Sequence, residues 1–180
     1  MKYISTEDTE ALRNLKVGDS VCLSGTVYTA RDAAHKRIAE LIKEGKPLPF
    51  PLKGAVIYYA GPTPSRDERP VGSCGPTTSS RMDKFAPELY SLGLAATIGK
   101  GERDHEVAEA CKKYGGVYFC AIGGAGALCS KAIIESEVIA FEDLGCESVK
   151  KMTVKDFPLI VATDSEGNDI FEERDSKKSR

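Results

Sequence analysis

LAATIGKGERDHEVAEACKKYGGVYFCA, residues 94–121, contains two short apolar runs on either side of a segment with helical spacing. The runs Leu94 to Ile98 and Val117 to Ala121 predict strands, and the residues from Asp104 to Tyr114 predict the helix between them. Strand, helix and strand in this order predict parallel pairing through a right-handed crossover. The stretch therefore indicates an α/β fold, with Gly99-Lys100-Gly101 at the end of its first strand.

The same alternation extends toward the N-terminus. Val21 to Tyr28 and Ala55 to Ala60 predict two further strands, and apolar residues from Ala33 to Ile42 have helical spacing between them. The connector Pro47 to Pro51 cannot continue that helix, because proline lacks an amide donor. Arg31 therefore lies at a strand-to-helix junction.

The chain from Gly61 to Thr78 is rich in glycine and proline, which predicts an irregular loop ordered around a ligand or partner. A helix is expected next, with Ser79 or Ser80 as its cap and Gly93 as its end. The apolar face of that helix consists of Met82, Phe85, Leu89 and Leu92.

The C-terminal third has a different pattern. A small-residue segment, 122–127, is expected to continue as a short helix through Ile134. Three strands and one hairpin turn are then predicted: Val149 to Val154, Leu159 to Thr163, the turn over 164–168, and Ile170 to Phe171. Residues 172–180 are expected to be a frayed tail, and without a linker or repeat the chain is expected to be one domain, 1–180.

Composition excludes several classes of function. The net charge of the 180 residues is −2, so the chain has no overall basic field for nucleic acid or an anionic membrane. Apolar runs are too short for a membrane helix, and Met1 to Leu15 has no signal-type core, so we expect a cytoplasmic protein. The six cysteines contain no Cys-x-x-Cys pair, so we expect reduced thiols and no metal site.

The most informative motif is GSCGPTTSSR, residues 72–81, which places the four hydroxyls of residues 77–80 and an arginine around a helix start. Helix N-termini present unpaired amides, and Arg81 can form a bidentate pair with a carboxylate or phosphate. The motif favours anion binding. The alternative is that Thr78 or Ser79 only caps the helix and that Arg81 is solvated.

Lys100 and Arg31 also follow strands, at the edge where ligands bind in open α/β sheets. Three cations at three strand ends fit a dicarboxylate. The alternatives are a solvated turn lysine and an Arg31 that pairs with Asp32 or a nearby glutamate.

Cys74 and His35 are weaker candidates. Cys74 lies in a glycine-bounded loop near a helix start, where a thiol can become nucleophilic, but a small buried thiol in a tight turn is favoured. His35 follows Arg31 closely enough to be a possible site neighbour. The segment 123–126 lacks the Gly-x-Gly-x-x-Gly pattern, which argues against a dinucleotide site.

Seven motifs in order resemble the β subunit, or the equivalent C-terminal domain, of class I iron-sulfur fumarate hydratases and L-tartrate dehydratases. They are TARDAAH (29–35), GPTP (61–64), residues 72–83, IGKG (98–101), GGA (123–125), EDLG (142–145) and VKDFP (154–158). The resemblance implies a swivelling β/β/α domain, with a partly parallel sheet, flanking helices and a second β layer.

The resemblance also implies a division of labour. In this family a four-iron four-sulfur cluster is held by three cysteines of the α subunit. The cysteines of this chain do not match those ligands, so we expect it to bind no cluster and no metal by itself. The expected partners are a cluster-bearing α subunit and a dicarboxylate, in a hetero-oligomer, and a homodimer of the isolated chain is left open.

By the same resemblance, Arg31, Arg81 and Lys100 are the carboxylate-binding residues, and Thr77 and Thr78 are the catalytic threonine pair, with Thr77 assisting proton transfer. The implied reaction is reversible addition or removal of water on a dicarboxylate. Arg66-Asp67-Glu68-Arg69 and Cys74 depart from the family pattern, which leaves fumarate or tartrate open. The competing hypotheses are a stand-alone anion-binding or regulatory domain using Thr77 to Arg81, and a hydrolase with Cys74 as nucleophile.

Overall fold

The computed structural model describes residues 1–121 and 126–178. Its strands are β1 (Lys2–Ser5), β2 (Ser20–Thr29), β3 (Val56–Tyr58), β4 (Ala96–Gly99), β5 (Val117–Ala121), β6 (Ile133–Ala140) and β7 (Val149–Thr163). Its helices are α1 (Thr9–Arg13), α2 (Asp32–Lys43), α3 (Ala86–Ser91), α4 (His105–Tyr114), α5 (Gly126–Lys131) and α6 (Ile170–Lys178), with short 3-10 helices η1 (Ser79–Met82) and η2 (Glu142–Glu147).

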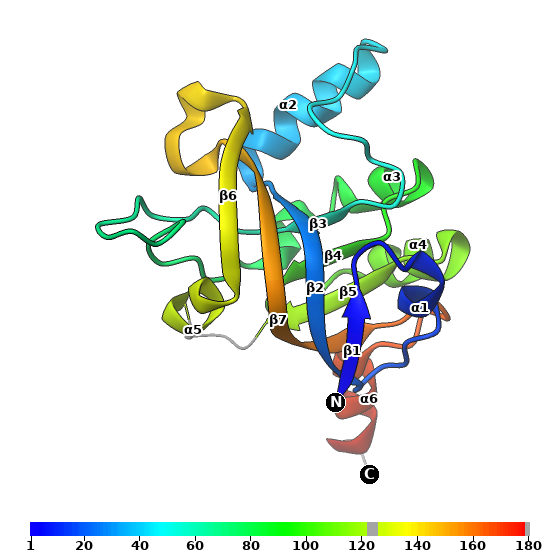
Figure 1. Cartoon of the computed structure of the whole chain (residues 1–180). Coiled ribbons are helices and arrows are strands. Elements are labelled where there is room, and N and C mark those ends of the chain that lie inside the picture. The colour runs from blue at the N-terminus through cyan, green and yellow to red at the C-terminus, as the bar shows by residue number, and fades with distance from the viewer. Residues whose placement is uncertain (122–125, 179–180) are drawn as a thin grey trace.

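The seven strands found in the described residues form one sheet, in the order β1-β2-β3-β4-β5-β7-β6. β1 to β5 pair in parallel, whereas β7 runs antiparallel to β2, β5 and β6. Because β7 pairs with both β5 and β2, the strands β2, β3, β4, β5 and β7 close into a ring (Figure 1). The predicted α/β class, with a partly parallel sheet and flanking helices, is confirmed.

The core has two layers, and β3 lies between them. Val56 and Tyr58 pack inside the ring, whereas Ile57 and Tyr59 pack against α2, α3 and α4 on its outer face. Side chains of a strand alternate between its two faces, and all four are completely buried, so the apolar run needs no polar positions.

Several predicted elements differ from the structure. The helix expected after Thr78 is divided into η1 and α3, because Pro87 in the first turn of α3 starts a new helix and cannot continue the previous one. The two strands predicted between Val149 and Thr163 are one long strand, β7. Asp156 adopts a positive φ of 50° within it, where its register with β2 shifts between Leu23 and Gly25.

The C-terminal prediction of a strand at Ile170–Phe171 was wrong. The turn over 164–168 is present, with the Gly167 amide donating to the Asp164 carbonyl at 3.0 Å. After it, Asp169 Oδ1 accepts hydrogen bonds from the amides of Phe171 and Glu172, which is how an aspartate starts a helix. Residues from 172 onward continue α6 to Lys178, where a frayed tail was expected.

The small-residue segment has a described and an undescribed part. Residues 122–125 lie outside the described residues, so the predictions for GGA (123–125) are not addressed there. α5 ends at Lys131, and β6 occupies the residues where the short helix was expected to finish. No helix within 1–121 and 126–178 is long and apolar enough to cross a membrane.

Candidate functional site

The predicted site residues follow three adjacent parallel strands. Arg31 follows β2 and is the N-cap residue of α2, and Lys100 follows β4. The loop after β3 returns to the sheet, where the Thr77 amide donates to the Tyr59 carbonyl at 2.7 Å. Thr78 then pairs with Lys100 in a parallel β-bridge. The carboxyl ends of β2, β3 and β4 therefore carry the arginine, the threonine pair and the lysine at one edge.

Arg31 is held by its own helix and by a glycine. Its carbonyl accepts hydrogen bonds from the His35 amide at 2.9 Å and from His35 Nδ1 at 2.8 Å. A Cβ on Gly61 would lie 3.1 Å from Arg31 Cδ, so the absence of a side chain there makes room for the arginine. Arg31 Nε is buried without a hydrogen-bond partner, and it lies 4.0 Å from carboxylate oxygens of Asp32 and of Glu147.

Arg81 is paired rather than solvated. Its Nε donates to Asp32 Oδ1 at 3.0 Å, and its Nη2 donates to Asp32 Oδ2 at 2.8 Å. These two hydrogen bonds hold the pKa of the Asp32 carboxyl below its ordinary value. The pair joins η1 to the first turn of α2, so Arg81 is fixed beside Arg31.

The predicted cationic cluster is therefore largely neutralised. Arg31, Arg81 and Lys100 carry three positive charges, and Asp32 and Glu147 bring two carboxylates, which leaves a formal charge of +1. Sequence reasoning considered Asp32 only as a partner of Arg31 and did not find Glu147. Glu147 lies more than a hundred residues away, so no local pattern indicates its approach.

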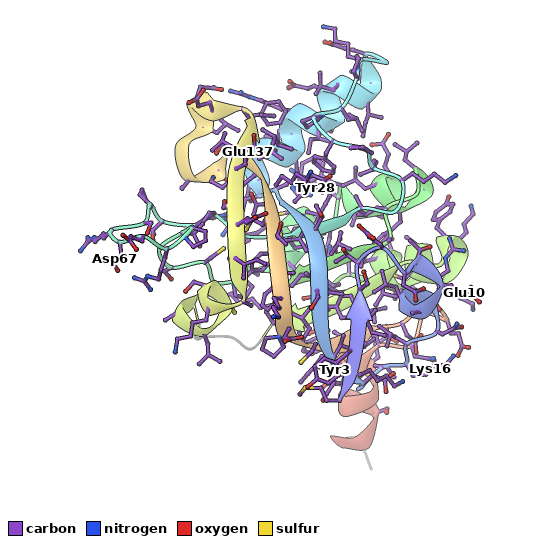
Figure 2. The ribbon with its side chains drawn as sticks, in the orientation of Figure 1. Tyr3, Glu10, Lys16, Tyr28, Asp67 and Glu137 are labelled. Carbon is purple, nitrogen blue, oxygen red and sulfur yellow. The ribbon has the colours of Figure 1, made fainter. Side chains whose placement is uncertain are left out.

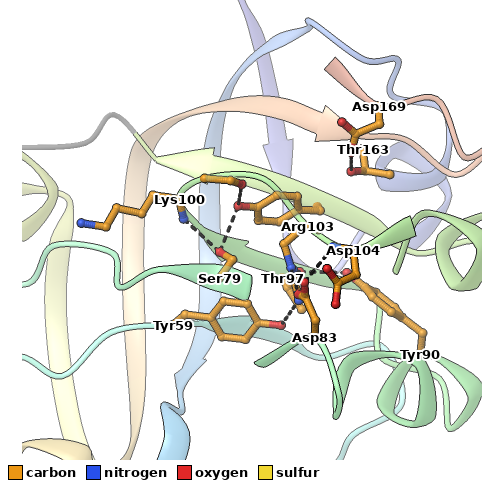
Figure 3. A network of polar contacts seen from close by, with 12 residues as sticks. Tyr59, Ser79, Asp83, Tyr90, Thr97, Lys100, Arg103, Asp104, Thr163 and Asp169 are labelled. Atoms are coloured by element: carbon orange, nitrogen blue, oxygen red, sulfur yellow. Dashed lines mark hydrogen bonds and ion pairs between the residues drawn. The ribbon is translucent and has the colours of Figure 1, made fainter. Parts of the chain in front are cut away.

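Ser79 connects the threonine loop to Lys100. The Ser79 amide donates to the Lys100 carbonyl at 3.0 Å, and the Lys100 amide donates to Ser79 Oγ at 3.0 Å. The Tyr118 hydroxyl lies 2.9 Å from Ser79 Oγ and 2.7 Å from the Gly101 carbonyl. The Lys100 side chain is exposed and points away from the buried polar network that surrounds Arg103 (Figure 3).

That buried network lies beneath the site, and sequence reasoning missed it. Arg103 forms an ion pair with Asp83, and both side chains are nearly inaccessible, at 1% and 4% exposed. Its guanidinium also lies 5.1 Å from the ring centroid of Tyr59 and 4.7 Å from that of Tyr118. Asp83 Oδ2 accepts from the Asp104 amide at 2.7 Å, so the network ties η1 to the start of α4.

Cys74 is not suited to nucleophilic catalysis. Burial raises the pKa of its thiol to about 12, whereas a nucleophilic cysteine needs a lowered pKa. The neighbouring Tyr58 hydroxyl donates to the Cys74 carbonyl at 2.7 Å, so the loop backbone is anchored in the core. The prediction of a buried thiol is confirmed, and the cysteine-hydrolase hypothesis is contradicted by this environment.

His35 is a structural neighbour of the site. Burial lowers its pKa to about 4, so the imidazole is neutral, and it contacts the rings of Tyr59 and Phe85. Its Nδ1 donates to the Arg31 carbonyl, so the imidazole contacts the backbone of that arginine.

The thiols do not form a metal site. No group of three or more His, Cys, Asp or Glu side chains in the described part of the chain is arranged to hold a metal ion. The residues present therefore do not fit a cluster.

A hollow of about 730 Å³ lies beside the projecting loop, and its lining contains none of Arg31, Thr77, Thr78, Arg81 and Lys100. Its lining is Thr63, Pro64, Arg66, Asp67, Arg69, Gly72, Ser73, Ala127 and Ser130. Asp67 is at the outer end of this loop (Figure 2), and it pairs with Arg69 in an exposed ion pair. Because this lining is largely exposed loop, the residues at the carboxyl ends of β2, β3 and β4 are the better candidates for a chemical role.

A protein-family model and a relative of similar length both match almost the whole chain. A family model described as "Fumarase C-terminus" matches residues 2–174. The "Putative L(+)-tartrate dehydratase subunit beta" of Methanocaldococcus jannaschii is 42% identical over 184 residues, covering 98% of this chain and 94% of that protein.

Longer proteins match as well. "Fumarate hydratase 2" of Leishmania major is 42% identical over 164 residues, covering 90% of this chain and 29% of that protein. The "Fumarate hydratase class I, anaerobic" of Escherichia coli (strain K12) is 41% identical over 164 residues, covering 90% of this chain and 30% of that protein. The chain therefore spans less than a third of the length of these fumarate hydratases.

Proposed function

The chain belongs to the fumarase C-terminus family, and from this we propose that it is the β subunit of a hydro-lyase acting on a dicarboxylate. The substrate pair is fumarate and malate, or tartrate and oxaloacetate. A cluster-bearing α subunit completes the site. The similarity to a putative tartrate dehydratase β subunit along 98% of this chain and 94% of that protein supports a heteromeric enzyme.

One observation carries the proposal: Arg31, the Thr77-Thr78 pair and Lys100 follow three neighbouring parallel strands, and Arg81 is tied to the same corner through Asp32. Guanidinium groups bind carboxylates in bidentate geometry, and an ammonium adds a compact positive charge. Two carboxylates of one small molecule are then held by cations that come from separate segments.

The roles of this chain's residues follow from their chemistry. Arg31, Arg81 and Lys100 bind the substrate carboxylates, and their charges stabilise the extra negative charge that develops on a carboxylate during the reaction. Thr77 assists proton transfer. A threonine hydroxyl is a weak base in water, so this role depends on charged groups brought by the partner.

The iron-sulfur cluster is assigned to the α subunit, because no group of three or more His, Cys, Asp or Glu side chains in the described part of this chain is arranged to hold a metal ion. A cluster bound there would supply Lewis acidity at the substrate hydroxyl. This chain supplies the residues that bind the substrate carboxylates.

The openness of the clamp explains why a partner is needed. Thr78, Arg81 and Lys100 are exposed, so water competes for each of their interactions with a substrate. Electrostatic stabilisation is strongest where water is excluded. We propose that the α subunit covers this edge, that the domain has the swivelling β/β/α arrangement, and that the enzyme is cytoplasmic.

The stand-alone anion-binding domain is the second candidate. The exposed positions of Thr78 and Lys100 favour it, since a ligand can reach them in the isolated chain. The carboxylates of Asp32 and Glu147 weigh against it, because they reduce the positive charge available to an anion.

The test is to express the chain with and without its α subunit and to assay hydration of fumarate and dehydration of malate and tartrate. The proposal predicts turnover of at least one substrate by the complex and none by the isolated chain. A reconstituted complex that turns over none of them would contradict it. Tight dicarboxylate binding by the isolated chain would favour the second candidate.

A further inference from the structure

The Asp32–Arg81 pair has a geometry with consequences for substrate binding. A guanidinium has five N–H donors, which form a side edge at Nε and Nη2 and an end edge at Nη1 and Nη2. Asp32 accepts from Nε at 3.0 Å and from Nη2 at 2.8 Å, so it occupies the side edge. The end edge is turned away from Asp32 and is wide enough to bind one further carboxylate in bidentate fashion.

Asp32 itself is well anchored. It is the first residue of α2, where the helix N-terminus favours a negative charge. The helix start is fixed by the two hydrogen bonds from His35 to the Arg31 carbonyl. The long, exposed side chain of Arg81 is thus held by a carboxylate at the start of a helix.

We infer that Asp32 is a positioning residue, which holds Arg81 by its side edge and presents the end edge to a substrate carboxylate. The inference rests on the proposed function. Arg81 is 48% exposed, and a long exposed arginine samples many rotamers unless a partner restrains it. Restraining it before substrate arrives removes part of the ordering cost from binding.

A blocking role for Asp32 predicts a change in substrate binding of the opposite sign. If Asp32 only occupied Arg81 in place of the substrate, removing its charge would release the arginine and tighten binding. If Asp32 positions Arg81, removing its charge weakens binding. The sign of the change in KM therefore separates the two roles.

The experiment uses the assembled enzyme with Asp32→Asn, which keeps the size of the side chain and removes one acceptor oxygen. We expect KM to rise by about tenfold and kcat to stay within about twofold, since the interaction acts on substrate binding. The matched control is Asp143→Asn. It breaks the bidentate pair between Arg37 of α2 and Asp143 of η2, and it should leave KM unchanged.

If the KM change caused by Asp32→Asn depends on Arg81, Asp32 acts by positioning that arginine and not through a general structural effect. In an Arg81→Ala background, Asp32→Asn should cause no further rise in KM, because the residue through which it acts is gone. A second readout needs no activity: in the isolated chain, the Arg81 Nε–H signal in NMR should exchange slowly with water, and rapidly in Asp32→Asn.

The outcomes distinguish a failure of the positioning role of Asp32 from a failure of the proposed function. A lower KM in Asp32→Asn, equal effects of Asp32→Asn and Asp143→Asn, or a full effect in the Arg81→Ala background would each overturn the positioning role. An inactive complex of the unaltered chain with its α subunit would instead overturn the proposed function.

Discussion

Ser79 and Lys100 are joined by reciprocal hydrogen bonds, from the Ser79 amide to the Lys100 carbonyl and from the Lys100 amide to Ser79 Oγ, both at 3.0 Å. The bonds hold the loop after β3 against the end of β4. They also fix Thr78 opposite Lys100. Gly99 makes this approach possible, because a Cβ there would lie 1.9 Å from Ser79 Oγ and 2.9 Å from Tyr59 Cδ2.

Gly99→Ala should therefore destabilise the chain by about 1 to 3 kcal/mol, the usual cost of overpacking a tight site. Urea denaturation measures this free energy of unfolding. The control is Gly75→Ala, whose Cβ would lie 3.3 Å from the Gly126 Cα and requires only a small adjustment. Equal stability of the two variants would contradict the tight contact at Gly99.

Arg103 should be among the most sensitive positions for stability. Arg103→Met leaves the buried Asp83 carboxylate without its ion-pair partner, and a loss of about 3 to 5 kcal/mol in the free energy of unfolding is expected. Arg69→Met removes an arginine from the exposed Arg69–Asp67 pair and should cost less than about 1 kcal/mol. Similar losses in the two variants would contradict a large contribution of the buried Arg103–Asp83 pair to stability.

The Asp32–Arg81 pair predicts a defined pH dependence. The pKa of Asp32 is lowered in the folded state from an ordinary value of 3.8, through the hydrogen bonds from Arg81, so acid protonates the unfolded chain first. Its contribution to stability is complete above the unfolded pKa and is lost as pH falls through the folded one. The difference in free energy of unfolding between the unaltered chain and Asp32→Asn should shrink below about pH 4. A difference that stays constant to about pH 2 would contradict this linkage.

Thiol labelling tests the assignment of Cys74. At neutral pH in the native state, an alkylating reagent should modify the exposed Cys146 first, and Cys74 and Cys111 only after unfolding. Burial raises the pKa values of the latter two thiols to about 12. Mass spectrometry of peptides gives the order directly, and rapid native labelling of Cys74 would revive the cysteine-hydrolase hypothesis.

The central strands β3 and β5 were predictable, because they are apolar runs buried on both faces and bounded by glycine or proline. β1 and β6 were not. The first is short and mostly exposed, and β6 is an edge strand whose Ile134 and Val138 remain exposed, so burial leaves little pattern in either. α6 depends on Asp169 acting as a cap, which a hairpin interpretation of the preceding turn conceals.

The positions of Arg31 and Lys100 directly after strands were predictable, but the partners of Arg31 and Arg81 were not. Asp32 is 49 residues from Arg81 in sequence, and the contact exists only because α2 and η1 lie side by side in the fold. The same holds for Arg103 and Asp83, whose pairing follows from burial between two tyrosine rings. Long-range charge pairing is a product of packing, and single-sequence patterns do not report it.

The convergence of Arg31 and Lys100 on one substrate is the central claim. Its most direct test is the dissociation constant of a dicarboxylate for the assembled complex, measured by calorimetry for Arg31→Ala and Lys100→Ala, with Arg37→Ala as the control. Each of the first two should weaken binding by about tenfold or more, since each removes a charge-assisted contact, and the control should bind as the unaltered complex does. Binding by Arg31→Ala and Lys100→Ala that matches the control would contradict the account.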